Sequence, residues 1–202
     1  MTDYKLNVQQ RLFKRIFDFS LSLIGIIVCF PIIIIGYICA TYDTKSSGLF
    51  VQNRIGKNGQ QFNVYKLKTM VNKQVVSTTV TQENDPRITR SGVWLRKYKI
   101  DELPQLFNVL MGDMSLVGPR PDVPGFADKL QGIDRAILSI RPGITGPASI
   151  KYKNEEQLLS NQVDAEEYNR DVIFPDKVNI NLKYIENWSI QSDLMYILKT
   201  LR

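Results

Sequence analysis

The sequence of 202 residues contains no histidine. This absence excludes catalytic triads built on histidine, histidine-ligated metal sites and histidine proton shuttles. There are only two cysteines, Cys29 and Cys39, and both lie inside an apolar run, which argues against a disulfide framework and against a zinc site. Any catalysis therefore depends on carboxylates, lysine, arginine, tyrosine, serine or a loosely held metal ion.

The sequence also lacks internal repeats, low-complexity tracts and the glycine-rich nucleotide-binding patterns GxxxxGK[ST] and GxGxxG. Acidic residues are in the minority, with 20 aspartates and glutamates against 26 lysines and arginines, which gives a net charge of +6. Such a balance favours an anionic partner: nucleic acid, a phospholipid surface or a phosphorylated substrate. The length and the apolar fraction of 44% predict one folded domain with an appendage.

Charge is absent from one stretch, which runs from Leu21 to Ala40 and reads LSLIGIIVCFPIIIIGYICA. A continuous helix of this length would cover about 30 Å, enough to cross a bilayer. A cleaved signal peptide fits poorly because no small-x-small cleavage site follows, and a lipid anchor on Cys29 fits poorly because bulky Ile27 and Val28 precede it. A buried core helix would normally have a polar face. We therefore expect the run to associate with a membrane.

Pro31 lies in the middle of this run. It lacks a backbone N–H and its ring collides with the carbonyl of Ile27, so the helix should kink or break there. Each arm is then about 15 Å long, half the thickness of the hydrocarbon. A hairpin with both ends on one membrane face and a kinked full span both remain open. Basic residues flank the run on both sides, which suits the hairpin; they are Arg11, Lys14, Arg15, Lys45, Arg54 and Lys57.

Beyond Tyr42 the sequence becomes polar and basic, so we divide the chain into a membrane segment, residues 1–42, and a soluble domain, residues 43–202. Residues 54–70 contain a Gly/Asn turn followed by alternating apolar side chains, which predicts a β-hairpin. Residues 71–92 are rich in threonine and asparagine and predict a loop. Residues 181–201 predict a single amphipathic helix.

Two adjacent carboxylates, Asp101 and Glu102, lie in the stretch KYKIDELPQL, shortly before Pro104. Apolar residues follow at helical spacing and Pro104 suits a first helical turn, so we predict a helix that begins here and ends near Gly112. Both carboxylates would then lie at the positive end of the helix, where each contributes about 0.3–1 kcal/mol. Taken alone, the stretch favours this structural role over a catalytic one.

Six stretches in order along the chain resemble the bacterial sugar transferase family, the small monotopic phosphoglycosyl transferases. They are KRIFDFSLSL, RIGKNGQQFNVYKLKTM, NDPRITRSG, LRKYKIDELPQLFNVLMGDMSLVGPRP, RPGITG and YIENWSIQSDL. One such stretch would be weak, but six in order from about Lys14 to the C-terminus are specific. A larger subgroup of the family adds further N-terminal membrane spans, which we do not expect in a chain of this length.

The resemblance implies an α+β, mainly helical protein at the cytoplasmic face of the bacterial inner membrane. The N-terminal part would be a membrane-inserted, re-entrant helix–break–helix with its break at Pro31, and the rest a compact cytosolic catalytic domain. Phe30 departs from the family pattern because serine usually precedes the proline, and a phenylalanine cannot satisfy freed backbone groups. A second departure follows RPGITG, where Lys151 or Lys153 would have to replace a basic residue used near the nucleotide.

The resemblance also implies the reaction. Such enzymes transfer a sugar-1-phosphate from a UDP-sugar to polyprenol (undecaprenyl) phosphate and release UMP, as the first membrane step of glycan assembly, and they need Mg²⁺. Asp101 matches the nucleophile, which forms a covalent aspartyl-phosphosugar intermediate, and it is also the expected Mg²⁺ ligand. Glu102 matches the second carboxylate, to which we assign orientation of the site or handling of a proton. Inner-membrane phospholipids are further implied partners.

Basic residues near this pair match the family's phosphate contacts. A guanidinium suits two phosphate oxygens at once, and a proline on either side of Arg120 would fix its backbone. Lys68 stands where arginine is usual in the family. For both Lys66 and Lys68, a phosphate contact and a plain surface charge are equally good interpretations. The residues assigned to phosphate or substrate binding are Arg96, Arg120, Lys66, Pro119 and Pro121. We assign Asp113 to bracing its loop, and Trp94, Tyr184 and Trp188 to the core or an interface.

Two alternatives remain open. An ordinary glycosyltransferase would release UDP in place of UMP, and a non-catalytic basic module that binds membrane surfaces or nucleic acid would release neither. The sequence lacks the aromatic motifs of RNA-binding domains, so we expect no nucleic-acid partner. The sugar, the glycan pathway (capsule, O-antigen, exopolysaccharide or glycoprotein) and the oligomeric state are not encoded in recognisable motifs.

Overall fold

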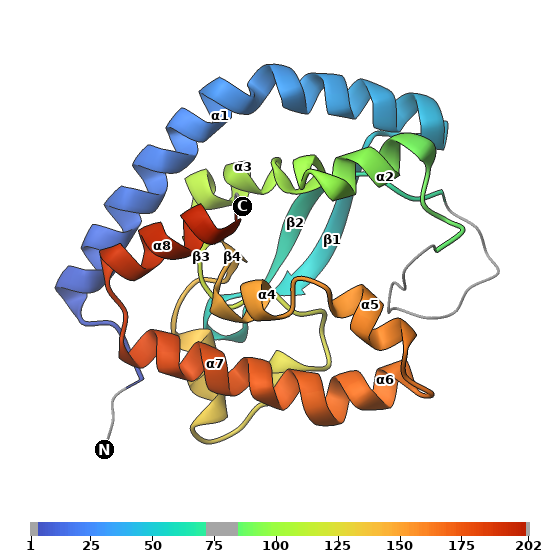
Figure 1. Cartoon of the computed structure of the whole chain (residues 1–202). Helices are drawn as coiled ribbons and strands as arrows, with labels where there is room; N and C mark the ends of the chain where they lie inside the picture. Colours follow the sequence, from blue (N-terminus) through green and yellow to red (C-terminus); the bar gives the residue numbers. More distant parts are fainter. Residues whose placement is uncertain (1–3, 72–84, 201–202) are drawn as a thin grey trace.

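The computed structural model describes residues 4–71 and 85–200, and shows a long helix arching over a domain of shorter helices and strands (Figure 1). Helices dominate, and the described strands form two small sheets, which confirms the α+β, mainly helical class. The helices and strands are α1 (Val8–Thr44), β1 (Leu49–Ile55), β2 (Gln61–Leu67), α2 (Arg90–Lys97), α3 (Gln105–Met111), β3 (Ser115–Val117), β4 (Gly143–Thr145), α4 (Pro147–Lys151), α5 (Glu155–Ser160), α6 (Ala165–Tyr168), α7 (Phe174–Glu186) and α8 (Ile190–Thr200). Shorter turns of 3₁₀- or π-helix are η1 (Lys57–Gly59), η2 (Ile100–Glu102), η3 (Ala127–Lys129), η4 (Asp134–Ser139) and η5 (Asn169–Ile173).

The helix α1 has well-defined ends. It begins at Asn7, where the side chains of Asn7 and Gln10 each accept a hydrogen bond from the other's backbone N–H. It ends at Lys45, whose backbone is left-handed (φ 49°). A kink or a break was predicted at Pro31; the break, which the resemblance also implied, is wrong, because α1 continues through this residue. Figure 1 instead shows α1 bending in its middle, as a helix does when a proline removes one hydrogen bond without ending it.

One stripe of α1 packs against the domain. Its buried residues Ser22, Ile33, Gly36 and Ala40 recur at helical spacing. Small side chains in this stripe let the two surfaces approach closely: a Cβ atom on Gly36 would lie 2.6 Å from Cδ1 of Leu67. The apolar run, which looked uniform in sequence, therefore has two distinct faces.

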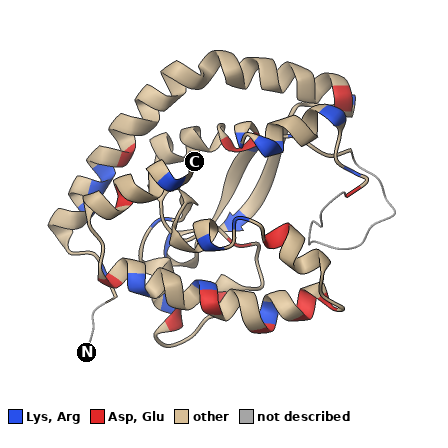
Figure 2. Ribbon diagram, viewed as in Figure 1, with Lys and Arg blue, Asp and Glu red and all other residues tan. Residues whose placement is uncertain are grey.

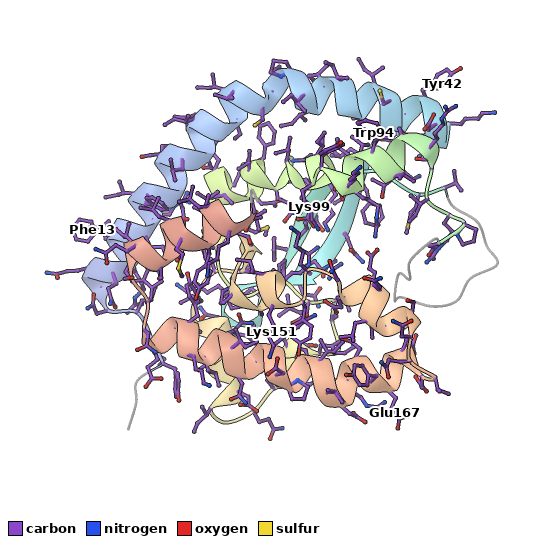
Figure 3. All side chains as sticks on the ribbon, in the orientation of Figure 1. Phe13, Tyr42, Trp94, Lys99, Lys151 and Glu167 are labelled. Carbon is purple, nitrogen blue, oxygen red and sulfur yellow. The ribbon has the colours of Figure 1, made fainter. Side chains whose placement is uncertain are left out.

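The opposite face of α1 is apolar and exposed. Figure 2 shows no charged residue along the middle of the helix, and Figure 3 shows Phe13 and Tyr42 pointing away from the domain. Among the described residues, α1 is the one helix long and apolar enough to cross a membrane. A continuous apolar surface of this kind marks an interaction site. Its exposed large side chains include Leu12, Phe13, Ile16, Phe19, Ile24, Ile27, Val28, Phe30, Ile35, Ile38 and Tyr42.

The predicted hairpin is confirmed, with β1 and β2 antiparallel from the pair Ile55–Gln61 to the pair Leu49–Leu67. Its first strand begins earlier than predicted. The loop predicted over residues 71–92 is partly wrong, because α2 begins at Arg90 and the Thr89 side chain caps it. Residues 72–84 of that prediction lie outside the described residues.

The predicted helix after Pro104 is confirmed as α3, which ends at Gly112 with φ 98°. Asp101 and Glu102 do not form its first turn, however, because they belong to the separate 3₁₀ turn η2. The parallel strands β3 and β4 follow, joined through Ser115–Gly143 and Val117–Thr145. The main hydrophobic core lies between these strands, the hairpin, α3 and α7; its fully buried members include Ile55, Val64, Val109, Met114 and Val117.

The single C-terminal helix predicted over residues 181–201 is wrong. Two helices occur there, because α7 ends at Glu186 and α8 begins at Ile190. Ser189 and Ser192 each donate a backbone N–H to the other's hydroxyl, which fixes the turn between them (3.2 and 3.1 Å). Of the predicted core aromatics, Tyr184 and Trp188 are buried, whereas Trp94 is exposed and packs on Tyr98 at 5.3 Å.

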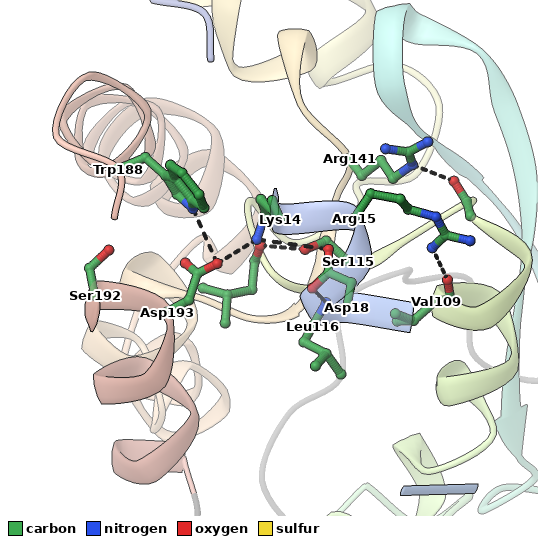
Figure 4. Close-up of polar contacts among 12 residues, drawn as sticks. Lys14, Arg15, Asp18, Val109, Ser115, Leu116, Arg141, Trp188, Ser192 and Asp193 are labelled. Carbon is green, nitrogen blue, oxygen red and sulfur yellow. Dashed lines mark hydrogen bonds and ion pairs between the residues drawn. The ribbon is translucent and has the colours of Figure 1, made fainter. Parts of the chain in front are cut away.

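A buried polar cluster joins α1 to α8 (Figure 4). The Asp193 carboxylate accepts hydrogen bonds from Lys14 Nζ at 2.6 Å, from the Tyr184 hydroxyl at 2.6 Å and from Trp188 Nε1 at 3.1 Å. Arg15 donates to two backbone carbonyls of α3. Lys14 and Arg15 were counted as flanking charges for the membrane, and the structure corrects this because both are engaged inside the protein.

Candidate active site

The turn that holds Asp101 and Glu102 is set by the backbone before it. Helix α2 stops at Lys97, and Lys99 adopts a left-handed conformation (φ 57°) that redirects the chain into η2. Gly36 of α1 lies against Ile100, the first residue of this turn. Both carboxylates are consequently buried in a short, sharply defined segment held between α1, α2 and β2.

Glu102 is the charged centre of the cluster. Its Oε1 accepts hydrogen bonds from Arg120 at 2.6 Å and from Lys66 Nζ at 3.1 Å. Burial raises the pKa of Glu102, but the charges of Arg120 and Lys66 outweigh burial and bring this pKa below its ordinary value. In return, the Glu102 charge raises the pKa of Arg120. Glu102 is therefore an ionised carboxylate that orients two cations.

Asp101 is in a different environment although it is the next residue. Its side chain is buried, and its Oδ1 atom has no hydrogen-bond partner among the described residues. Burial, followed by the charge of Glu102, raises the pKa of Asp101 to about 6. A buried carboxylate oxygen without a partner is costly to maintain and is available to a ligand or to an electrophile.

Arg120 belongs to a loop that the two predicted prolines frame. The carbonyl of Pro119 accepts the N–H of Gly143 at 2.8 Å, and the carbonyl of Pro121 accepts a hydrogen bond from Arg54 Nη1 at 3.1 Å. These contacts fasten the backbone on both sides of Arg120, whose side chain is 45% exposed and reaches Glu102. The predicted grouping of Lys66, Arg120 and the two carboxylates is thus what the structure brings together.

Three charged residues near this cluster were not assigned in advance. Burial and the charge of Arg120 lower the pKa of Arg54 to about 10, and burial raises the pKa of Asp122 to about 6. The Lys99 charge partly opposes the rise in the pKa of Asp101, and it adds to the lowering of the pKa of Glu102. Only Lys99 had a signal in the sequence, its position two residues before Asp101. Arg54 and Asp122 reach the site through the fold.

Other predicted residues are engaged elsewhere. Arg96 forms an ion pair with Glu156 of α5, although its charge also acts on Asp101. Lys68 donates to the Ser46 hydroxyl at 2.8 Å, away from the carboxylates. Lys151, proposed as a replacement for a nucleotide contact, pairs with Asp176 at 2.6 Å. These three assignments to phosphate or nucleotide remain predictions.

The residues around Asp101 allow one mode of metal binding. No group of three or more acidic or cysteine side chains is placed to hold a metal within the described residues. Magnesium, however, commonly takes one or two carboxylates and completes its shell with water and substrate phosphates. The unpartnered Oδ1 atom of Asp101 fits that mode, whereas Glu102 is already occupied by Lys66 and Arg120.

Comparison with known sequences decides the family. The profile of the bacterial sugar transferases matches residues 9–202, nearly the whole chain. This chain belongs to the bacterial sugar transferase family. The buried Asp101–Glu102 cluster lies within the matched region, as do α1 and both C-terminal helices.

Three relatives illustrate the range of this family. This family member is 36% identical over 201 residues to the galactosyl transferase CpsE of Streptococcus agalactiae, covering 94% of this chain and 41% of the relative. It is 36% identical over 197 residues to the undecaprenyl-phosphate glucose phosphotransferase of Komagataeibacter xylinus, covering 94% and 35%. It is 32% identical over 207 residues to the exopolysaccharide production protein ExoY of Rhizobium meliloti, covering 93% and 83%. The chain thus spans less than half the length of the first two relatives.

Proposed function

We propose that this protein transfers a sugar-1-phosphate from a UDP-sugar to polyprenol phosphate and releases UMP. The observation that carries the proposal is the pairing of a buried, unpartnered Asp101 oxygen with the Glu102–Lys66–Arg120 cluster next to it. The names of relatives point the same way, since one is an undecaprenyl-phosphate glucose phosphotransferase. The product would enter the assembly of a bacterial surface glycan.

The proposed reaction has two displacements. An Asp101 oxygen attacks the phosphorus that bears the sugar, the bond from that phosphorus to the bridging oxygen breaks, and UMP leaves with the bridging oxygen. An oxygen of polyprenol phosphate then attacks the same phosphorus, and the Asp101 carboxylate is released. Covalent catalysis of this kind divides one difficult displacement into two. The bond between the sugar's anomeric carbon and its oxygen stays intact throughout.

The residues around Asp101 support this chemistry. Arg120 and Lys66 bring positive charge to a site that must accept a diphosphate beside two carboxylates. Glu102 keeps these two cations in place and ionised. A magnesium ion, held by Asp101 when bound, would neutralise charge on the diphosphate. The raised pKa of Asp101 means that the nucleophile is ionised above about pH 6 and protonated below it.

We also propose that α1 enters the inner membrane from the cytoplasmic face and returns to it. Both ends of α1 are tied to the same domain, which supports this topology over a full span. Near its start Lys14 bonds Asp193 at 2.6 Å, and near its end the Asp43 carboxylate accepts the N–H of Ser91 at 2.7 Å. The exposed apolar face between these ties would contact lipid.

Intact-protein mass spectrometry tests the chemistry. The full chain in detergent is incubated with Mg²⁺ and a panel of UDP-sugars, without polyprenol phosphate. We expect wild type to gain the mass of a phosphosugar and to release UMP, and chelation of Mg²⁺ with EDTA to abolish both. Asp101→Asn should gain no mass, because an amide is a poor nucleophile.

Two controls make the result decisive. Asp101→Asn should be at least as stable as wild type above pH 6, because its charge is unfavourably buried, so that loss of the adduct does not reflect unfolding. Asp134→Asn, an exposed change of the same kind, should form the adduct normally. Release of UDP, or an adduct on Asp101→Asn, would refute the mechanism.

A further inference from the structure

A second basic cluster surrounds a small pocket beneath the N-terminal turns of α1. The pocket lies between α1, the hairpin turn η1, the start of β3 and the segment from η4 to Arg141. Four cationic side chains and one carboxylate line it, together with two serines. The lining residues are Leu6, Arg11, Lys14, Asp18, Lys57, Ser115, Ser139, Ile140 and Arg141.

The positive charge in this pocket is only partly balanced, by the carboxylates of Asp18 and Asp113, which act on Arg141. Lys14 is bound to Asp193, and Asp18 lies 4.0 Å from the same ammonium group. Within the described residues, none of Arg11, Lys57 and Arg141 forms a salt bridge. Like charges crowd one another here: burial and then the charges of Arg141 and Arg11 lower the pKa of Lys57. A partly buried group of like charges of this kind is stabilised by an anion.

The neighbouring backbone leaves little freedom to disperse these charges. Arg141 donates its Nε to the carbonyl of Gly112 at 2.6 Å, which holds its guanidinium beside that of Arg15 (Figure 4). Burial, followed by the charge of Arg15, lowers the pKa of Arg141. Lys57 lies in the tight η1 turn, whose next residue, Asn58, is left-handed (φ 58°). The backbone at Lys57 and the guanidinium of Arg141 are therefore fixed by local structure, whereas Arg11 reaches the pocket from the exposed surface of α1.

The pocket lies at the edge of the apolar face of α1. In the first three turns of this helix, Val8, Leu12 and Ile16 are exposed by 75%, 59% and 54%. Arg11, on the other side of these turns, lines the pocket. Cations placed directly behind an exposed apolar face are in the position of groups that meet phosphates at the surface of a bilayer.

The pocket is separate from the Asp101 cluster. Lys57 is in the turn that closes the β1–β2 hairpin, whereas Lys66 lies opposite Phe50, five residue pairs away from the closing pair Ile55–Gln61. At about 3.4 Å per residue, this separation is about 17 Å along the hairpin. One phosphate group does not reach both sites.

We propose that this pocket is a phosphate-binding site, formed by Arg11, Lys57 and Arg141, that holds an anion beside the exposed apolar face of α1; its place at a bilayer rests on the membrane insertion of α1 proposed above. The same chemistry would accept the phosphodiester of a phospholipid headgroup or a free phosphate ion. Guanidinium and ammonium groups on three sides suit the oxygens of such a group. The site would fix the start of α1 relative to the bilayer surface.

Native mass spectrometry of the full chain in detergent micelles distinguishes the two sources. In one arm the micelles contain phosphatidylglycerol, or diacylglycerol as a lipid without phosphate. In the other arm, inorganic phosphate is titrated into the same protein in micelles without phosphatidylglycerol, and its binding is measured by calorimetry. The test variant is Arg11→Gln with Lys57→Gln, and the matched control is Lys129→Gln with Lys183→Gln, which removes the same charge from exposed positions.

We expect wild type and the control to bind phosphatidylglycerol in preference to diacylglycerol. The test variant should bind phosphatidylglycerol about 100-fold more weakly than wild type does, or about tenfold more weakly for each charge removed. Binding of inorganic phosphate alone, with the same loss in the test variant, would identify a free anion as the ligand. The proposal would be overturned if the test variant bound phosphatidylglycerol and inorganic phosphate as tightly as wild type does, or if wild type bound neither. Asp101→Asn should bind as wild type does, so this site and the catalytic proposal fail separately.

Discussion

Adjacent carboxyl groups acquire opposite properties at Asp101 and Glu102, and the cause is the direction in which each side chain points. Glu102 reaches Lys66 and Arg120, which bring its pKa below the ordinary value. Asp101 is buried without a partner for its Oδ1, and its pKa rises to about 6. Glu102 thus stays charged and orients two cations, while Asp101 keeps a buried oxygen without a hydrogen-bond partner among the described residues.

This arrangement makes a prediction about Glu102→Gln. The charge of Glu102 is, after burial, the second cause of the raised pKa of Asp101. Its removal should lower the pKa of Asp101 and move the acidic limb of the kcat/KM profile below pH 6. Turnover should fall by roughly 10–100-fold, because Lys66 and Arg120 lose the group that orients them. The profile is measured by UMP release between pH 4.5 and 8.

The control for this experiment is Glu166→Gln, an exposed glutamate on α6. It should leave both the rate and the acidic limb unchanged. An acidic limb of Glu102→Gln that coincides with that of wild type would show that Asp101 is not the titrating group.

At this scale, the sequence motif was sufficient to assign Asp101, Glu102, Lys66 and Arg120 to one cluster, because a resemblance identifies residues by position. It was not sufficient to find Arg54, which enters through the register of the hairpin and the Pro121 carbonyl. Nor does a motif show that Arg96 pairs with Glu156, because α5 has no signal that places it there. Residues contributed by distant elements need the fold.

Among the elements, α1 has the clearest division between two faces. Its exposed side carries large apolar side chains, and its packed side carries small ones, which bring the helix backbone close to β2 and to the turn before Asp101. Gly36 lies where these contacts are tightest, against Leu67, Leu95 and Ile100. The long apolar helix is thereby coupled directly to the segment that holds Asp101 and Glu102, the proposed catalytic carboxylates.

Gly36→Leu tests this coupling. A Cβ atom at this position would already lie 2.6 Å from Leu67 Cδ1, so the larger side chain must push α1 away from the domain. We expect a loss of about 1–3 kcal/mol in the free energy of unfolding, typical of overpacking, and slower adduct formation because Ile100 precedes Asp101 directly. The thermal unfolding midpoint in detergent and the initial rate of adduct formation measure the two effects.

Cys39→Leu is the matched control, because it adds bulk on the exposed side of the same helix. Its unfolding midpoint and rate should match those of wild type. Wild-type behaviour of Gly36→Leu would show that α1 does not pack on the domain as described.

Local patterns predicted the elements that local rules govern. Alternation and a Gly/Asn turn were enough for the hairpin, and Gly112 was enough for the end of α3. The choice between a kink and a break at Pro31 could not be made, because a proline signals the loss of a hydrogen bond but not whether packing preserves the helix on both sides. The division between α7 and α8 was missed for a similar reason, since periodicity continues across the serine-capped turn.

Over the whole molecule, the first and last helices meet in one buried contact. Lys14 and Asp193 are 179 residues apart in sequence, and both are nearly inaccessible to solvent. Their neighbours Tyr184 and Trp188 complete the hydrogen bonds of the Asp193 carboxylate. Helix α1 is therefore held by α8 as well as by α2 and α3. The amphipathic pattern of α8 gave no indication that Asp193 faces inward.

Asp193→Asn should therefore weaken the molecule as a whole. The amide removes the nearer of the two carboxylates that face the buried Lys14 ammonium and leaves it only Asp18, at 4.0 Å. Loss of one partner of a buried ion pair costs about 3–5 kcal/mol. We expect a clearly lower unfolding midpoint in detergent and faster proteolysis within α1, because the tie between the two helices is weakened. Lys14→Met combined with Asp193→Asn should recover part of the lost stability. Lys14→Met removes the buried ammonium that has lost its nearer carboxylate, while the amide oxygen introduced at position 193 can still accept a hydrogen bond from Tyr184 or Trp188. A double variant as unstable as Asp193→Asn alone would mean that the cost arises from the aromatic hydrogen bonds and not from the ion pair that joins the two ends of the chain.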